Sequence, residues 1–77
     1  MGIKQIPLTT FKKFLKQQGL KHIRNNHGHE IWDRPNNPLP RPVTLQGRYK
    51  DIPPTHIHTN LLTLGITHKE FEKWLKR

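Results

Sequence analysis

The sequence has 77 residues and a mass of 9.2 kDa, which leaves room for one domain, residues 1–77, and excludes separate substrate and cofactor domains. Fourteen Lys and Arg residues against five Asp and Glu residues give a formal net charge of +9, which indicates a polyanionic partner and favours nucleic acid. The absence of cysteine excludes disulfides, thiolate zinc sites and a cysteine nucleophile, and the absence of serine excludes a serine hydrolase.

Several other classes of protein are disfavoured by what the sequence lacks. No stretch approaches the roughly 20 apolar residues of a membrane span, and the first residues lack the apolar run of a secretion signal. No glycine-rich phosphate loop or pair of catalytic carboxylates is apparent, so we expect no small-molecule cofactor. We expect a cytoplasmic protein that does not enter a membrane.

The first predicted element is an amphipathic helix within residues 8–19. Apolar side chains recur there at helical spacing, with lysines around the remaining surface. Thr9 or Thr10 is expected to cap its first turn, and Gly19 suits the left-handed residue that ends a helix. The apolar face comprises Leu8, Phe11, Phe14 and Leu15.

Strands follow in the middle of the chain. Residues 20–24 and 29–34 read as two strands joined by a turn over Asn25-Asn26-His27-Gly28. Residues 35–42 hold four prolines and are expected to form a loop. Residues 43–46 alternate apolar and polar side chains, which predicts a third strand that continues past Gly47 towards Tyr49.

Two helices are predicted near the carboxyl end. Pro54 suits a first helical turn, and apolar residues then recur at helical spacing until Gly65. Thr67 and Glu70 match a capping box before a short final helix with Phe71, Trp74 and Leu75 on one face. The sequence therefore predicts an α+β fold in the order α-β-β-β-α with a short extra helix. Its three-stranded antiparallel sheet would carry the helices on one face.

Histidine is the residue type with the clearest chemical potential in this chain. An imidazole titrates near neutral pH and can transfer the protons that metal-free RNA cleavage requires, because RNA supplies its own 2′-hydroxyl nucleophile. His29 is the candidate base or acid, with His27 or another imidazole as its complement. Lysines, arginines and one glycine are the candidate RNA contacts, namely Lys21, Arg24, Gly28, Arg34, Arg48 and Lys50. The six histidines are His22, His27, His29, His56, His58 and His68.

Other interpretations of these residues remain open from the residues alone. Each histidine can equally be an ordinary surface or half-buried side chain. Two His-x-His pairs suggest a metal site with His27, His29, His56 and His58 as donors, although no cysteine and few carboxylates are available. A non-catalytic nucleic-acid-binding module would have the same charge. Among the aromatic residues, Trp32 is expected to be buried, and Tyr49 is the better candidate to stack on a base.

The order of motifs resembles the HicA family of toxin endoribonucleases. The resemblance runs from Phe11-Lys12-Lys13-Phe14-Leu15 through Gly28-His29-x-x-Trp32 to the carboxyl end. The later segments are similar to a HicA-like subgroup: Arg41-Pro42-Val43-Thr44-Leu45-Gln46, Ile52-Pro53 and Asn60-Leu61-x-Thr63-Leu64-Gly65-Ile66-Thr67.

The resemblance implies a fold, an activity and a partner. The implied fold is similar to the double-stranded-RNA-binding domain, and the implied activity is metal-independent cleavage of messenger RNA with His29 as the catalytic residue. The implied partner is a HicB-like antitoxin protein that covers the toxin. This sequence departs from the family pattern at His27, where the family usually has glycine, so either a changed turn or a second imidazole near the site is expected.

Overall fold

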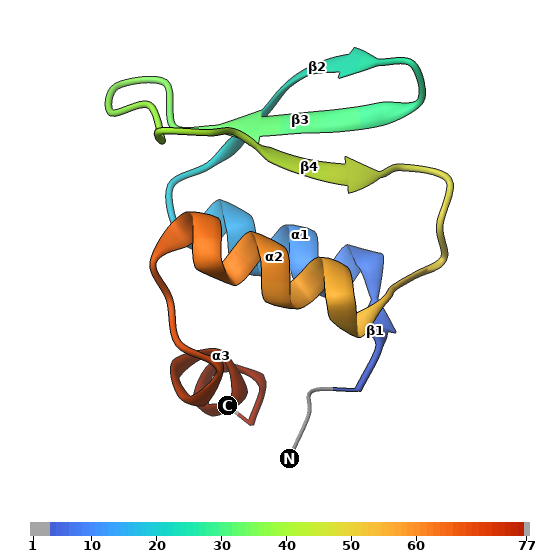
Figure 1. Cartoon of the computed structure of the whole chain (residues 1–77), viewed down its shortest axis with the longest axis vertical. Coiled ribbons are helices and arrows are strands. Elements are labelled where there is room, and N and C mark those ends of the chain that lie inside the picture. Colours follow the sequence, from blue (N-terminus) through green and yellow to red (C-terminus); the bar gives the residue numbers. More distant parts are fainter. Residues whose placement is uncertain (1–3, 77) are drawn as a thin grey trace.

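The computed structural model describes residues 4–76, which form three layers. A three-stranded antiparallel sheet lies at one side, α1 and α2 pack side by side on one of its faces, and α3 lies beyond them (Figure 1). The α+β class, the three-stranded sheet and the three helices are thereby confirmed. The elements are β1 (Ile6–Pro7), α1 (Leu8–Gln17), β2 (Lys21–Asn26), β3 (His29–Asp33), β4 (Val43–Gln46), β5 (Asp51–Ile52), α2 (Pro54–Leu64) and α3 (His68–Leu75).

The sheet has the strand order β2-β3-β4 and is built around one tight hairpin. Asn26 pairs with His29, so only His27 and Gly28 form the turn, with φ angles of 54° and 84°. The predicted turn over residues 25–28 was therefore too long, because β2 continues through the two asparagines. Two consecutive residues with positive φ match the twist of an antiparallel hairpin, and this places His29 at the first position of β3.

The start of α1 differs from the prediction. Pro7 occupies the N-cap position with no side-chain cap, so the predicted capping by Thr9 or Thr10 is wrong. The helix follows β1 directly, and the Leu8 amide instead donates to the Lys50 carbonyl at 2.9 Å. The predicted helix end is confirmed, since Gly19 has a φ of 86°.

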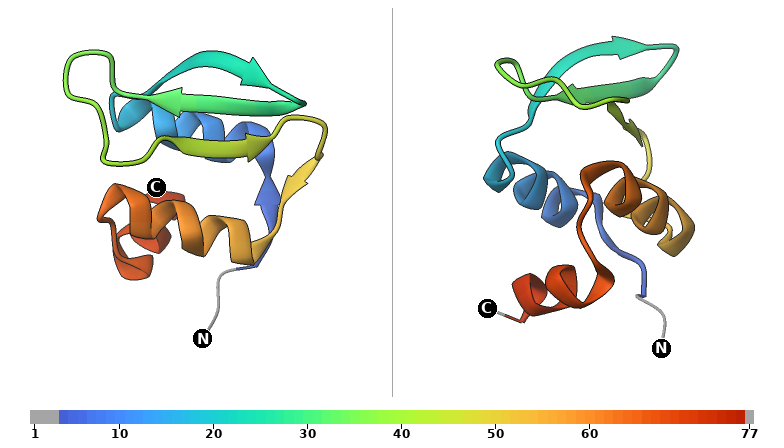
Figure 2. Two further views of the ribbon diagram at one scale, coloured as in Figure 1. Left: turned by 45° about the horizontal axis from the view of Figure 1, so that its top comes forward. Right: turned by 60° about the vertical axis from the view of Figure 1, so that its left-hand side comes forward.

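A second, two-stranded sheet was not predicted. β1 and β5 pair antiparallel, with Ile6 opposite Ile52, and we call this pair of strands the β1–β5 clip. It joins the start of α1 to the start of α2. The third strand ends at Gln46 and does not continue to Tyr49, whose amide turns back to the Gln46 carbonyl at 3.0 Å. The clip is visible beside the helix ends in the left view of Figure 2.

The core lies between the sheet and the helices and extends to α3. Trp32 is 3% exposed, which confirms its predicted burial. Phe71 of α3 contacts the rings of Phe11 and Phe14 on α1, at centroid distances of 5.6 and 4.7 Å. Helix α1 is thus covered by the sheet on one side and by α3 on the other (Figure 2, right). Within residues 4–76, no helix is long and apolar enough to cross a membrane.

The predicted capping box of α3 is present in full. The Glu70 amide donates to the Thr67 hydroxyl at 3.1 Å, and the Thr67 amide donates to the Glu70 carboxylate at 3.2 Å. We expect Thr67→Ala to lower the free energy of unfolding by about 1 kcal/mol. In a domain of this size, that is a fall in melting temperature of about 4–8 °C. Circular dichroism during heating measures it. Thr9→Ala is the control, because Thr9 caps nothing and its change should stay within about 0.5 kcal/mol.

Candidate active site

A groove of about 250 Å³ runs between β4 and α2 and contains the principal sequence-predicted residue, His29. One wall comes from α2, where four residues at successive helical steps face the groove. The other wall comes from β4, the two residues before it and the start of β3. We call this the β4–α2 groove. It is lined by His29, Arg41, Pro42, Thr44, Gln46, His56, Thr59, Asn60 and Thr63.

Hydrogen bonds fix the tautomer of His29. Its Nδ1 lies 3.3 Å from the Asn26 carbonyl oxygen, and its Nε2 lies 2.7 Å from Nε2 of Gln46. A carbonyl oxygen only accepts, so Nδ1 carries the proton. In the neutral ring Nε2 then has the lone pair and accepts from the Gln46 amide. His29 is therefore held with its Nε2 against the Gln46 amide, and both side chains line the groove.

Two further groups give the groove its chemical character. His56 is half-buried in the first turn of α2, and its ring stacks on Tyr49 at a centroid distance of 6.0 Å and an angle of 13°. Arg41 is exposed in the loop before β4. No Asp or Glu lines the groove in the described part of the chain. Two imidazoles and one guanidinium therefore surround a space suited to an anion.

The other predicted contacts lie outside this groove. His27 is exposed on the hairpin turn beside Gly28, and Lys21 and Arg24 are exposed along β2. Arg34 has a structural contact, because its Nε donates to the Gln18 carbonyl at 2.9 Å and so satisfies the end of α1. Arg48 and Lys50 are exposed in the turn between β4 and β5. Their roles as RNA contacts, and that of His27 as a catalytic helper, stay predictions.

Sequence reasoning missed Arg41 as a site residue. It named His56 as a metal donor and otherwise left it among the imidazoles that could complement His29. Arg41 lies in a proline-rich segment that was interpreted as a loop. It stands two residues before the strand predicted over residues 43–46, and that position was the available signal. His56 follows Pro54 by two residues, so it had to lie in a first helical turn, but nothing local indicated which element faces that turn.

The metal interpretation finds no geometric support. Among residues 4–76, no group of three or more His, Cys, Asp or Glu side chains is placed to hold a metal ion. The expected metal donors lie in different parts of the molecule. His29 and His56 line the β4–α2 groove, whereas His58 contacts His68, with 2.8 Å between Nδ1 of His58 and Nε2 of His68. The four imidazoles of the two His-x-His pairs therefore do not form one site.

Comparisons with protein-family models, curated proteins and solved structures find no match to this chain. The likeness to HicA toxins rests on the ordered motifs of the sequence.

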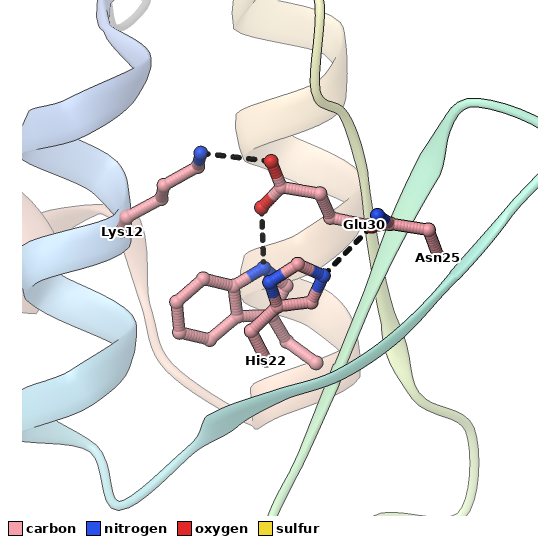
Figure 3. A network of polar contacts seen from close by, with 5 residues as sticks. Lys12, His22, Asn25 and Glu30 are labelled. Carbon is pink, nitrogen blue, oxygen red and sulfur yellow. Dashed lines mark hydrogen bonds and ion pairs between the residues drawn. The ribbon is translucent and has the colours of Figure 1, made fainter.

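A second polar cluster lies on the other side of the sheet, around Glu30 (Figure 3). Glu30 accepts hydrogen bonds from Lys12 Nζ at 2.9 Å and from the Trp32 indole nitrogen at 3.1 Å. The His22 ring stacks on Trp32 at 5.6 Å and contacts Asn25. Desolvation raises the pKa of the Glu30 carboxyl. The hydrogen bonds from Lys12 and Trp32 and the charges of Lys12 and His22 lower it by a larger amount, so the pKa lies below its ordinary value.

This cluster predicts a pH-dependent contribution to stability. Glu30→Gln is expected to lower the free energy of unfolding at pH 7 by roughly 1–2 kcal/mol, because Lys12 loses its ionic partner. A depressed folded-state pKa stabilises the fold above the unfolded-state pKa of about 4.3, and this contribution is lost as pH falls through the folded-state value. Urea unfolding at neutral pH and again at about pH 2 to 3 should show the difference shrinking in acid.

The matched control is Glu72→Gln. The Glu72 side chain makes no hydrogen bond or ion pair within residues 4–76, so the loss of its charge should have a small effect at both pH values. A Glu30→Gln deficit of the same size at both pH values would assign the effect to packing and contradict the ionic explanation.

Proposed function

We propose that this chain is a HicA-like toxin, an endoribonuclease that cuts messenger RNA without a metal ion or cofactor. The observation that carries the proposal is the position of His29, whose Nε2 accepts from Gln46 in a groove that Arg41 also lines. A net charge of +9 supports attraction of a polyanion to the chain as a whole. The order of α1, three antiparallel strands and α2, with both helices on one face, supports the finer assignment to a double-stranded-RNA-binding-domain-like fold.

The chemistry follows from groups that RNA and the groove supply together. His29 Nε2 takes the proton of a 2′-hydroxyl, and the 2′-oxygen attacks the adjacent phosphorus. The bond between phosphorus and the 5′-oxygen breaks, and that oxygen takes up a proton. The products are a 2′,3′-cyclic phosphate and a 5′-hydroxyl. Arg41 offers a bidentate guanidinium to the phosphate oxygens as negative charge develops on them.

The test of the proposed function uses the purified full chain with RNA in excess EDTA. We expect cleavage that leaves cyclic phosphate and 5′-hydroxyl ends, and no cleavage where a single 2′-deoxynucleotide replaces the nucleotide before the cut. Cleavage that requires Mg²⁺, or that leaves a 5′-phosphate, would contradict the mechanism. Salt-dependent binding with no cleavage of any RNA would show instead a non-catalytic nucleic-acid-binding module.

We also propose that a HicB-like antitoxin protein covers this chain in the cell. The excess of basic residues would be complemented by an acidic partner surface, which steers association. Co-expression with the protein encoded beside the chain should relieve growth arrest and yield a complex on copurification. Growth arrest that persists although the two proteins form a complex would show that the partner does not cover the site.

A further inference from the structure

We infer that His56 is a second catalytic residue, the acid that protonates the leaving 5′-oxygen, acting across the β4–α2 groove from His29. The inference rests on the proposed function, because it names the proton donor of that same cleavage. It starts from one juxtaposition: His29 of β3, His56 of α2 and Arg41 of the preceding loop line a single groove of about 250 Å³.

The free state of the His56 ring distinguishes it from most other histidines of this chain. His22 contacts Asn25, His29 contacts Asn26 and Gln46, and the rings of His58 and His68 contact each other. Within residues 4–76, the His56 ring has no hydrogen-bond partner, although it is half-buried. Its nitrogens are available to a ligand in the groove.

Two contacts nevertheless restrict His56. The backbone around it belongs to the first turn of α2, where the His56 amide donates to the Pro53 carbonyl at 3.0 Å. Tyr49 lies nearly parallel to the ring, at an angle of 13° and a centroid distance of 6.0 Å, and so restricts the ring from one face without occupying its nitrogens. A ring that is restricted on one face and has free nitrogens can transfer a proton to a substrate bound in the groove.

The two imidazoles divide the proton transfers between them. His29 accepts at Nε2 because its Nδ1 is already committed to a carbonyl oxygen. The complementary proton then comes from the imidazolium form of His56 and goes to the 5′-oxygen as the bond from phosphorus to that oxygen breaks. One proton enters His29 and one leaves His56, so the step balances without a metal ion. The charged and titratable groups that face the groove are His29, His56 and Arg41, with Tyr49 behind the His56 ring.

The deciding experiment compares two substrates in His56→Gln, His29→Ala and a control variant. One substrate is a short RNA, and the other is the same RNA with sulfur in place of the bridging 5′-oxygen at the cut. A thiolate leaves without protonation, because thiols ionise near about pH 8.5. We expect His56→Gln to cleave the normal RNA about 10²- to 10⁴-fold more slowly than the parent, and the sulfur-containing RNA at close to the parental rate.

The control variant is His58→Gln, which removes the other imidazole of the same His-x-His pair. His58 is exposed and contacts His68 outside the groove, so cleavage of both substrates should match the parent. His29→Ala should be slow on both substrates, because a better leaving group does not replace the base. In the pH profile of kcat/KM, His56→Gln should lose the decline at high pH that deprotonation of the acid causes in the parent.

Each outcome has one meaning. Parental cleavage of normal RNA by His56→Gln overturns the inference and leaves the proposed function intact. An equal loss on both substrates also overturns it, because a structural role or a base would respond in that way. The reverse pattern, with His29→Ala rescued by sulfur, would overturn the assignment of acid and base. Absence of cleavage by the parent chain would instead refute the proposed function itself.

Discussion

His29→Ala is expected to slow RNA cleavage by about 10²- to 10⁴-fold while the chain remains folded and still binds RNA. The imidazole is half-buried and belongs to no core cluster, so its loss removes a proton acceptor and two hydrogen bonds but no core packing. The neutral ring contributes nothing to the net charge of +9, so attraction to the phosphate backbone should persist. Single-turnover cleavage, RNA binding at several salt concentrations and thermal unfolding measure the three properties separately.

In cells, the same variant should relieve the growth arrest that expression of the parent chain causes. His68→Gln is a suitable control, since it also replaces one imidazole but lies at the start of α3, away from the β4–α2 groove. Undiminished cleavage by His29→Ala would refute the assignment of this residue as catalytic. If the variant loses its fold, His29→Gln, which keeps a polar partner for Gln46, repeats the test without opening the site.

The largest effect on stability is expected from Phe71→Ala. Phe71 is the buried residue of α3, is fully inaccessible, and packs edge-on against Phe11 and Phe14. Removing a ring from such a position typically lowers the free energy of unfolding by about 3–5 kcal/mol. A domain of this length has a total of only about 4–12 kcal/mol, so this loss removes at least about a quarter of it and should move the urea unfolding midpoint strongly downwards.

Urea unfolding followed by circular dichroism measures this change. Phe71→Leu keeps most of the apolar volume and should lose much less than the alanine variant. Lys73→Ala on the exposed side of the same helix should leave the midpoint almost unchanged. If Phe71→Ala unfolded at the same urea concentration as the parent, α3 would not be an integral part of the core.

The sequence predicted the long elements because their patterns are local. Leu8, Phe11, Phe14 and Leu15 repeat at helical spacing, and all four are buried as expected. Thr67 and Glu70 define the start of α3 without reference to the rest of the chain. The β1–β5 clip was missed because two residues are too few to show alternation, and its partners lie far apart in sequence. The predicted threonine cap of α1 was wrong for the same reason, since the distant Lys50 carbonyl accepts from the first helical amide.

The candidate site was only partly predictable for a related reason. His29 was identified through a short motif and the hairpin beside it. The groove opposite it is formed by Arg41 and His56, which are separated from His29 by a loop and by β4. Net charge indicates attraction to a polyanion, but it does not show which cations face which groove. Arg34 illustrates this point: it adds to the net charge, but its Nε donates to the Gln18 carbonyl at the end of α1.

The β1–β5 clip has a consequence for the order of folding. The β2–β3 hairpin closes over two residues and presents His29 through local contacts, which form quickly. The clip pairs Ile6 with Ile52 across about 45 residues, a closure with a much larger loss of chain entropy. Because β5 leads directly into the first turn of α2, we expect His56 to reach the groove only when this late closure has occurred. A nascent or partly folded chain would then display His29 without its opposing imidazole, and the groove would become complete only with the native topology.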